Sequence, residues 1–309
     1  MSISKSIHNG IEVFTIESDH LNVSVAPILG GKIISVYNKF LQKEFLWNNK
    51  NLPLAINPPG SEYDPNFWGA IDELILNDLP ETIDSISYPD HGELWTTALQ
   101  HLFSDEKITV HATLELSGFY YSKTMHLDPH APIIWLDYKI KNETDEQRHF
   151  LWKLHAALRI EPGDKLVTSA KHGKVVDPEY SRFKTQNEFM WPSIENTDAS
   201  IIPPETNTMD FFYLYDISRA EMQLLSKDDN YVFSYSYDKK VFPYQWYFAS
   251  YGGFLNHYTV ILEPCTNMPL SVNEAIEKQQ CAILLPGQEL ITSVRIFAGE
   301  KKNYIPLHE

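Results

Sequence analysis

The sequence predicts an all-β protein, one large antiparallel β-sandwich with few short helices. The first reason is an alternation of apolar and polar residues, which gives a strand one core face and one second face. The alternation covers four stretches, residues 21–27, 108–116, 133–144 and 231–237. The second reason is that helical periodicity is scarce. Similar strand patterns flank the most loop-like stretch, 196–210, so we expect residues 1–309 to form a single domain.

Further elements are predicted near the C-terminus. Residues 260–262 are of types that sheets favour, and Pro264, which cannot donate to a sheet ladder, indicates that this strand ends or lies at an edge. Residues 271–279 begin with the serine and glutamate spacing of a capping box, which predicts a short helix. Residues 281–297 are typical of a strand, a Pro-Gly turn and a second strand.

The composition excludes several classes of partner. Lys plus Arg number 25 against 41 Asp plus Glu, a net charge of −16, and no basic stripe is present. Nucleic acids and anionic membrane surfaces are therefore not expected partners. The two cysteines, Cys265 and Cys281, do not suggest a disulfide framework. The sequence contains no signal-peptide pattern and no apolar run long enough for a membrane span, which predicts a cytoplasmic protein.

The stretch "YPDHGELW", residues 88–95, sets ionisable side chains among aromatic ones. Gly92, directly after His91, allows a positive φ or a close approach of the backbone. Glu93 and Trp95 follow at a spacing of two. The simpler interpretation is a turn with a solvated histidine. His91 and Glu93 could also be two metal ligands, but no further histidine pair completes a ligand set.

The stretch "FLWKLHAALRI", residues 150–160, alternates between an apolar face and a basic one. The basic face carries Lys153, His155 and Arg159, and the small Ala157 between them leaves room for a ligand. A plain solvent face seldom has this composition. A structural role for His155 remains the competing interpretation.

Two more stretches bear candidate residues. "FPYQWYFASYGGFLNHYT", residues 242–259, is dense in aromatics, which could form core or line a sugar pocket. Glu263 follows it at a strand end, where a carboxylate could serve chemistry. "FWGAIDELI", residues 67–75, brings Asp72 after an apolar run, and its simpler interpretation is the start of a helix or turn. Phosphate-loop, nucleophile-elbow and Cys-x-x-Cys motifs are absent from the sequence.

Taken together and in order, these stretches resemble the galactose mutarotase-like superfamily, the aldose 1-epimerases. The resemblance covers nearly the whole chain. It is carried by six motifs: "VAPILGGKIISVYN" (25–38), "GAIDEL" (69–74), "DHGELW" (90–95), "WKLHAAL" (152–158), "FPYQWYFASYGG" with "LEPCTNMP" (242–269) and "LLPGQEL" (284–290), which looks like the family's closing hairpin. The resemblance implies the superfamily's large sandwich and a sugar bound in its concave face.

The resemblance also implies roles for particular residues. His91 matches the first family histidine, which helps hold the sugar near its ring oxygen, and His155 matches the second, the usual general acid. Glu263 matches the general base. Asp72 falls near acids that bind sugar hydroxyls. The remaining expected substrate-binding residues lie within or beside the same motifs: Glu93, Trp95, Lys153, Trp246 and Tyr247.

The chemistry of anomer exchange accounts for these residue types. One base removes the proton of the C1 hydroxyl and one acid protonates the ring oxygen, each contributing roughly 10²–10⁴-fold. The ring opens, the C1–C2 bond rotates and the reverse steps close it. A carboxylate base with an imidazolium acid suffices near neutral pH, so no cofactor and no metal are expected.

The chain departs from the family pattern at several positions. Ala156 follows His155 where many relatives have proline, Lys32 follows the Gly-Gly bend where arginine is common, and the Asn-Arg pair that contacts sugar hydroxyls is missing. These departures bear on substrate identity. We expect an aldose 1-epimerase acting on a hexose or related sugar. The alternatives are a non-catalytic sugar-binding or sugar-sensing protein on the same fold, and another isomerase or lyase acting on a modified sugar. The sequence leaves open which histidine donates the proton, and also the oligomeric state.

Overall fold

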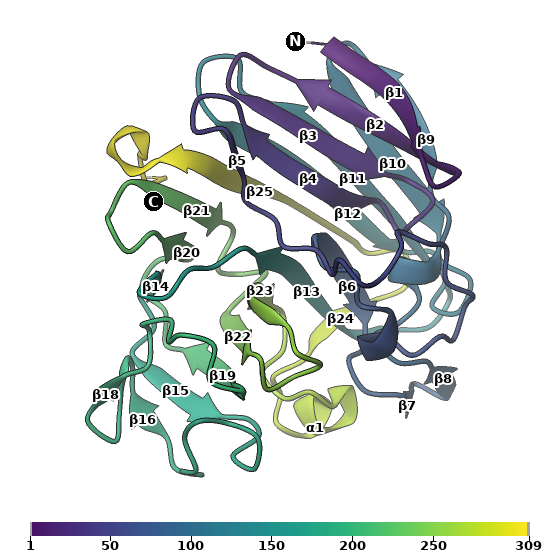
Figure 1. Ribbon diagram of the computed structural model, residues 1–309. Helices are drawn as coiled ribbons and strands as arrows, with labels where there is room; N and C mark the ends of the chain where they lie inside the picture. Colours follow the sequence, from purple (N-terminus) through teal and green to yellow (C-terminus); the bar gives the residue numbers. More distant parts are fainter. Residues whose placement is uncertain (1, 308–309) are drawn as a thin grey trace.

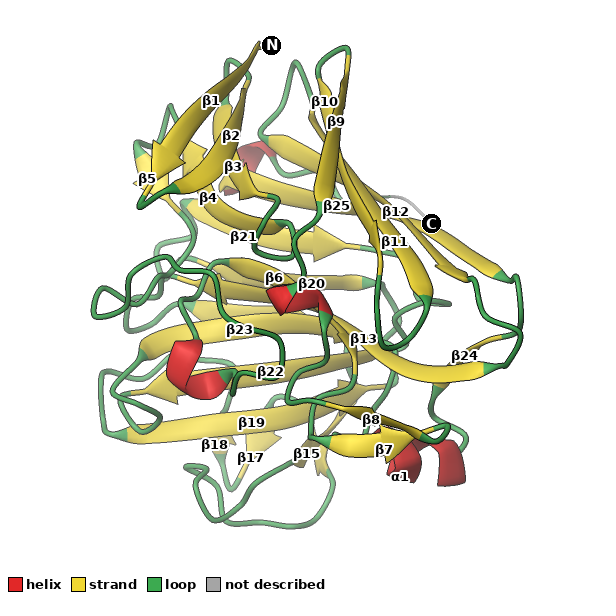
Figure 2. Cartoon of the chain, turned by 90° about the vertical axis from the view of Figure 1, so that its right-hand side faces the viewer, coloured by secondary structure: helices red, strands yellow, loops and turns green. Residues whose placement is uncertain are grey.

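Two large antiparallel sheets pack against each other and enclose the main core (Figures 1 and 2). The structure, a computed structural model, describes residues 2–307. Strands dominate it and helices are few and short, so the predicted all-β sandwich is confirmed. The predicted single domain, 1–309, includes Met1 and residues 308–309, which lie outside the described part, and it stays a prediction.

The larger sheet runs through eleven strands in hydrogen-bonded order, with two short strands attached at its side. In that order the strands are β1 (Ser2–His8), β2 (Ile11–Glu17), β3 (Leu21–Ala26), β4 (Lys32–Asn38), β6 (Ile71–Leu76), β13 (Arg148–Leu158), β23 (Tyr258–Cys265), β22 (Tyr244–Tyr251), β19 (Thr208–Tyr215), β15 (His172–Val175) and β16 (Phe189–Met190). The attached strands are β5 (Lys43–Glu44), on β4, and β24 (Ala282–Leu284), on β13.

The second sheet has eight strands. Its order is β14 (Lys165–Thr168), β20 (Glu221–Leu225), β21 (Tyr231–Ser236), β25 (Glu289–Glu300), β12 (Ile133–Asn142), β11 (Phe119–Leu127), β10 (Lys107–Thr113) and β9 (Gln100–Ser104). The strands predicted from alternation at 108–116, 133–144 and 231–237 therefore share one sheet. Within them the alternation holds, since Ile108 and Val110 are buried while their neighbours are partly exposed.

Small elements connect these sheets. Two hairpins stand apart, formed by β7 (Glu81–Ile83) with β8 (Ile86–Tyr88) and by β17 (Ser193–Ile194) with β18 (Thr197–Asp198). The one α-helix of the described residues, α1 (Val272–Glu277), begins as predicted, with the Ser271 hydroxyl accepting the backbone N–H of Glu274. Three 3₁₀ helices complete the set: η1 (Asp64–Asn66), η2 (Leu94–Thr96) and η3 (Lys301–Asn303).

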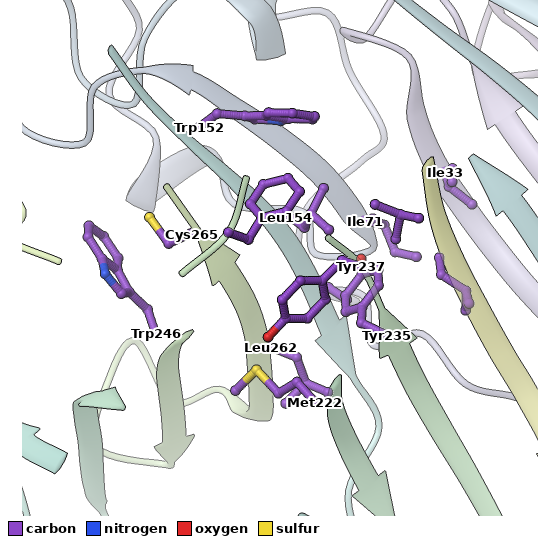
Figure 3. Packing of buried hydrophobic residues seen from close by; sticks show 14 of the residues in the cluster. Ile33, Ile71, Trp152, Leu154, Met222, Tyr235, Tyr237, Trp246, Leu262 and Cys265 are labelled. Carbon is purple, nitrogen blue, oxygen red and sulfur yellow. The ribbon is translucent and has the colours of Figure 1, made fainter. Parts of the chain in front are cut away.

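The core lies between the inner faces of the sheets. Figure 3 shows part of it, including Trp152 and Leu154 of β13 and Tyr235 of β21. A buried ion pair also crosses it. Glu73 of β6 accepts from the Lys123 ammonium at 2.6 Å and from the Tyr138 hydroxyl at 2.7 Å. The other face of the larger sheet, which points away from this core, is therefore available for a binding site.

Of the two alternatives predicted for the strand containing Pro264, the strand end is confirmed, since β23 ends at Cys265, and the edge position is not, since β13 and β22 flank it. Two other expectations about strands are corrected. Residues 281–297 form two strands without pairing as a hairpin, since β24 joins β13 and β25 joins the other sheet. Asp72 lies in strand β6 rather than at a helix start. Across residues 2–307, none of the helices has the length and hydrophobicity that crossing a bilayer requires.

Candidate active site

Four neighbouring strands, β13, β23, β22 and β19, form the floor of a cavity on the second face of the larger sheet. One row of cross-strand partners runs from Phe211 through Phe248 to Ile261, and Ala157 continues it. The next row on this face pairs Trp246 with Glu263. Because side chains alternate along each strand, the residues of these two rows share a face.

His155 and Glu263 are neighbours across β13 and β23. Lys153 is paired with Cys265. Because the strands are antiparallel, His155, two residues after Lys153, lies opposite Glu263, two residues before Cys265. The ladder is interrupted here, because its next recorded pair joins Ala156 and Leu262. Pro264 has no N–H to donate, which explains the interruption. The sheet thus brings a carboxylate and an imidazole together at a weakened point of its ladder.

His91 reaches the cavity from a tight loop between β8 and η2. Its φ is 57° and that of Gly92 is 71°. A Cβ at Gly92 would lie 2.2 Å from the carbonyl oxygen of Ile75, so only glycine fits. The His91 backbone N–H donates to the Asp78 carbonyl at 2.9 Å. The sequence named a positive φ and a close backbone approach as alternatives for Gly92, and the structure has both.

The cavity has a volume of about 300 Å³ and mixes apolar and ionisable walls. This volume is at the lower end of the range for small-molecule pockets, about 300–1,000 Å³. The ionisable and phenolic lining residues are Tyr63, Asp64, Asp78, His91, Lys153, His155, Asp177 and Glu263. The apolar ones are Phe67, Val176, Met209, Phe211, Phe248, Phe254, Ile261 and Leu270. The three residues expected to be catalytic, and Lys153, thus line one cavity.

A buried ammonium joins two carboxylates at the cavity. Lys153 Nζ lies 2.5 Å from Asp78 Oδ1, to which it donates, and 3.0 Å from Glu263 Oε2. The second contact is an ion pair, and Lys153 is the only cation within ion-pair distance of Glu263 among residues 2–307. Glu263 is 1% exposed. A carboxylate has about four lone-pair sites, so Glu263 can accept a ligand hydroxyl beside this one ammonium.

A second chain of contacts leads from Lys32 to His155. Lys32 Nζ lies 2.5 Å from Asp72 Oδ2, which also accepts the Tyr63 hydroxyl at 2.8 Å. The Tyr63 oxygen lies 3.4 Å from His155 Nδ1. Because the single hydroxyl proton of Tyr63 is donated to the carboxylate, its oxygen can accept from an Nδ1–H of His155. This arrangement favours the tautomer with Nε2 as the unprotonated nitrogen.

Tyr63 also contacts the other histidine. Its ring stacks on the His91 imidazole, with centroids 4.3 Å apart and planes at 15°. The same imidazole lies between two carboxylates, with Nδ1 at 2.9 Å from Asp90 Oδ1 and Nε2 at 3.5 Å from Asp78 Oδ1. One aromatic residue therefore orients both histidines of the cavity.

Burial and nearby charges shift the titration of these groups. Burial, together with Lys153 and His91, lowers the pKa of His155 well below its usual value. Burial raises the pKa of the Glu263 carboxyl, and Lys153 only partly offsets this. Burial would also raise the pKa of Asp78, but the charges of Lys153 and His91 outweigh it and hold the pKa low. The free protein therefore holds His155 as a neutral imidazole at pH 7, not as the imidazolium expected from the sequence.

Two acids expected to bind substrate lie outside the cavity lining. Asp72 is 2% exposed and lies behind Tyr63, bonded to it and to Lys32. Glu93 accepts the backbone N–H groups of Leu116 and Ser117 at 2.8 and 2.9 Å. Asp72 can influence a ligand through Tyr63, whereas the observed contacts of Glu93 tie two segments of backbone together.

Three aromatic residues expected at the site also do not line this cavity. Trp95 packs edge-on against Tyr63 and lines a small neighbouring hollow. Trp246 is fully buried beneath the Lys153 ammonium, which lies 4.8 Å from its ring. Tyr247 alternates to the opposite face and stacks on Phe212. From the same aromatic stretch, Phe248 and Phe254 reach the cavity instead.

Several lining residues were not predicted from the sequence. Tyr63 and Asp64 stand in "SEYDPNFW", directly before a stretch that was recognised, and Asp78 lies two residues after the end of strand β6. Asp177 comes just after β15, far away in sequence. Trp246 is the cross-strand partner of Glu263, and side chains alternate along a strand. With this register known, Phe248 rather than Tyr247 would have been predicted to face the cavity. No three His, Cys, Asp or Glu side chains group as metal ligands in the described part of the chain.

Comparison with known proteins identifies the fold. No protein-family model and no curated protein matches the chain. A solved "putative aldose 1-epimerase" from Klebsiella pneumoniae is similar, with a TM-score of 0.75, 14% identity, and 97% of this chain and 84% of that chain covered. The Slr1438 protein from Synechocystis has a TM-score of 0.72 at 15% identity, covering 97% and 99%.

A third solved structure agrees with these two. A galactose mutarotase-like protein from Clostridium acetobutylicum has a TM-score of 0.71 at 13% identity, covering 97% of this chain and 99% of that chain. The chain therefore has the galactose mutarotase-like sandwich fold, along nearly its whole length, as the resemblance of its motifs implied. Identities this low carry the fold and not the activity.

Proposed function

We propose that this protein interconverts the α and β anomers of a hexose or related sugar, as an aldose 1-epimerase. The observation that carries the proposal is that Glu263 and His155 are neighbours on one cavity face, and that the Lys153 ammonium is the only cation within ion-pair distance of Glu263 among residues 2–307. The names of the structural neighbours support the same reaction class. The expectation of a cytoplasmic enzyme without metal or cofactor belongs to this proposal.

In the proposed reaction the Glu263 carboxylate takes the proton of the C1 hydroxyl. His155 gives a proton to the ring oxygen, the C1–O5 bond breaks, and an open-chain aldehyde forms. Rotation about C1–C2 presents the other face of the carbonyl to the hydroxyl. Ring closure then returns the proton from Glu263 to the C1 oxygen and the ring-oxygen proton to His155, so both groups regain their starting states.

The surroundings fit both proton transfers. Burial raises the pKa of Glu263, which makes its carboxylate a stronger base than an exposed one. The lowered pKa of His155 makes its imidazolium a minor form but a stronger acid toward the weakly basic ring oxygen. The Tyr63 oxygen lies 3.4 Å from His155 Nδ1 and can accept its N–H in both the imidazolium and the neutral form that is protonated at Nδ1. His91 is the second candidate donor, with Asp90 and Asp78 beside it.

The apolar half of the cavity suits a sugar ring. Pyranose rings expose C–H groups on their faces, and flat aromatic rings pack well against them. Four phenylalanine rings line the cavity: Phe67, Phe211, Phe248 and Phe254. These rings can hold the sugar while Glu263 and His155 meet C1 and the ring oxygen.

The proposal is tested by anomer exchange measured by NMR on a panel of aldoses. We expect the wild type to accelerate exchange and both Glu263→Gln and His155→Ala to lose at least about 100-fold, the lower range for a general acid or base. Glu62→Gln, an exposed acid outside the cavity lining, is the matched control and should retain full activity. Full activity in Glu263→Gln would overturn the proposal.

The alternative is a sugar-binding protein without catalysis. One observation favours it, because the Lys153 ammonium lies 3.0 Å from the proposed base and weakens its basicity. A binder would leave every exchange rate at the uncatalysed value, while a sugar would still broaden or shift protein signals. This outcome would replace the epimerase proposal with the binding one.

A further inference from the structure

The cavity carries more negative charge than its one ammonium can balance. Four carboxylates line it, those of Asp64, Asp78, Asp177 and Glu263. Lys153 is the one lysine or arginine that lines it within residues 2–307, and it is committed to Asp78 and Glu263. Lys153 and His91 act on Asp64 only from a distance, and neither Asp64 nor Asp177 has a cation of the cavity within ion-pair distance.

Neither of these two acids is paired elsewhere. In the described chain, no lysine, arginine or histidine forms an ion pair with Asp64 or Asp177. Asp177 Oδ1 accepts only the backbone N–H of Glu179, at a long 3.3 Å. The Asp64 carboxylate accepts no hydrogen bond there. Although Asp64 is exposed, the protein around it removes enough water to raise the pKa of its carboxyl. Both acids are available to a ligand.

Their depth differs from that of the proposed catalytic groups. Glu263, His155 and Lys153 are 1–4% exposed and lie on the sheet floor. Asp64, the first residue of η1, is exposed, and Asp177, in the loop after β15, is half-buried, so they stand at the rim. In a pyranose with C1 at Glu263, the C4 and C6 side is the end of the ring remote from Glu263. The inference assigns the substituents of that side to the rim.

We propose that the site takes an aldose bearing a protonated amino group on the side remote from C1, held by Asp64 and Asp177, and excludes aldose phosphates. The substrate class rests on the proposed function, since it assumes that C1 lies at Glu263. An ammonium supplies the missing counter-charge and up to three N–H donors. A phosphate brings two further negative charges to a rim without a free cation, which like-charge repulsion disfavours.

Three sugars that differ only at C6 test this inference: 6-amino-6-deoxyglucose, glucose and glucose 6-phosphate, with the matching galactose set. Affinity is measured by calorimetry or ligand-observed NMR, so the readout does not require catalysis. We expect the amine to bind about 2- to 30-fold tighter than the hydroxyl, the range for two exposed ion pairs of ordinary strength. The phosphate should bind more weakly than the hydroxyl. Added salt should compress both differences.

Asp64→Asn and Asp177→Asn, alone and combined, test the assignment to these residues. The double variant should bring the amine and hydroxyl sugars to within about 2-fold of each other, while Glu62→Gln, two residues from Asp64, should keep the wild-type order. An unchanged order in the double variant, or a phosphate that binds as tightly as the hydroxyl, would overturn the inference.

The same data separate this inference from the epimerase proposal. The expected affinity order without any accelerated anomer exchange would retain the rim assignment and overturn the catalytic function. Accelerated anomer exchange on glucose or galactose, without an affinity order that follows the charge at C6, would retain the catalytic function and overturn the rim assignment. If none of the six sugars binds, both are overturned.

Discussion

The hydroxyl of Tyr63 lies 3.4 Å from Nδ1 of His155 and donates its own proton to Asp72. The proposed general acid is thereby oriented by a residue from a loop more than ninety positions earlier in the chain. The ring of the same tyrosine stacks on His91. The two histidines of the cavity are thus held by one side chain.

Removing this hydroxyl should affect catalysis through His155. In Tyr63→Phe the Nδ1–H of His155 loses its acceptor, and Asp72 loses one donor. We expect a loss of about 1–3 kcal/mol of unfolding free energy and a lower kcat. The imidazole ¹⁵N NMR spectrum should show a changed tautomer ratio for His155. Tyr180→Phe, at a position 61% exposed, is the matched control. An unchanged tautomer ratio would contradict the positioning role of Tyr63.

Lys153 should be essential for stability as well as for the site. Lys153→Met leaves Asp78 and Glu263 as two buried carboxylates without their cation. We expect a loss of about 3–5 kcal/mol of unfolding free energy at pH 7. The loss should shrink toward pH 5, where the carboxyls can protonate. Urea denaturation at both pH values measures this, with the exposed Lys278→Met as control, for which a change within about 0.5 kcal/mol is expected.

Gly92 should tolerate no side chain. In Gly92→Ala the new Cβ meets the Ile75 carbonyl oxygen at 2.2 Å, so the loop carrying His91 must move. Gly10→Ala is the matched control, because Gly10 also has a positive φ, 80°, but open space around it. The control should lose only about 1–2 kcal/mol from backbone strain. Thermal unfolding should separate the two variants clearly, and equal losses would show that the contact at Ile75 is unimportant.

The stability of the protein should fall in mild acid partly because of His155. Its folded pKa lies below the ordinary value of 6.5, so the unfolded chain binds this proton first as the pH falls. Stability is then lost from about pH 6.5 downward, at up to about 1.4 kcal/mol per pH unit for one proton. His155→Asn should have a shallower slope in this window. His130→Asn, at an exposed position, should keep the wild-type slope.

Catalysis should have its optimum on the acidic side of pH 7. The proposed reaction needs Glu263 ionised, although its pKa is raised. It also needs His155 protonated, although its pKa is lowered. The pH profile of kcat/KM should therefore fall above the pKa of His155 and below that of Glu263. Anomer exchange measured from pH 4 to 9 tests this. A rate that rises steadily into the alkaline range would contradict His155 as the acid.

The period-two alternation determined much of this protein from its sequence alone. It predicted the strands, because each strand buries one face wherever it lies, and Ser271 predicted the start of α1 because capping is local. Motif order then identified His91, His155 and Glu263, which line one cavity. Local chemistry also predicted the conformation of Gly92.

Only the tertiary structure decided what surrounds these groups. The partners Lys153, Asp78 and Tyr63 come together through strand register and loop closure, which join positions far apart in sequence. Register also directs Tyr247 into the interior and Phe248 toward the cavity, because a shift of one residue reverses every face. The protonation of His155 depends on burial and on charges from other elements. Residue types and local periodicity are properties of the chain, whereas desolvation and charge pairing exist only once the fold has assembled them.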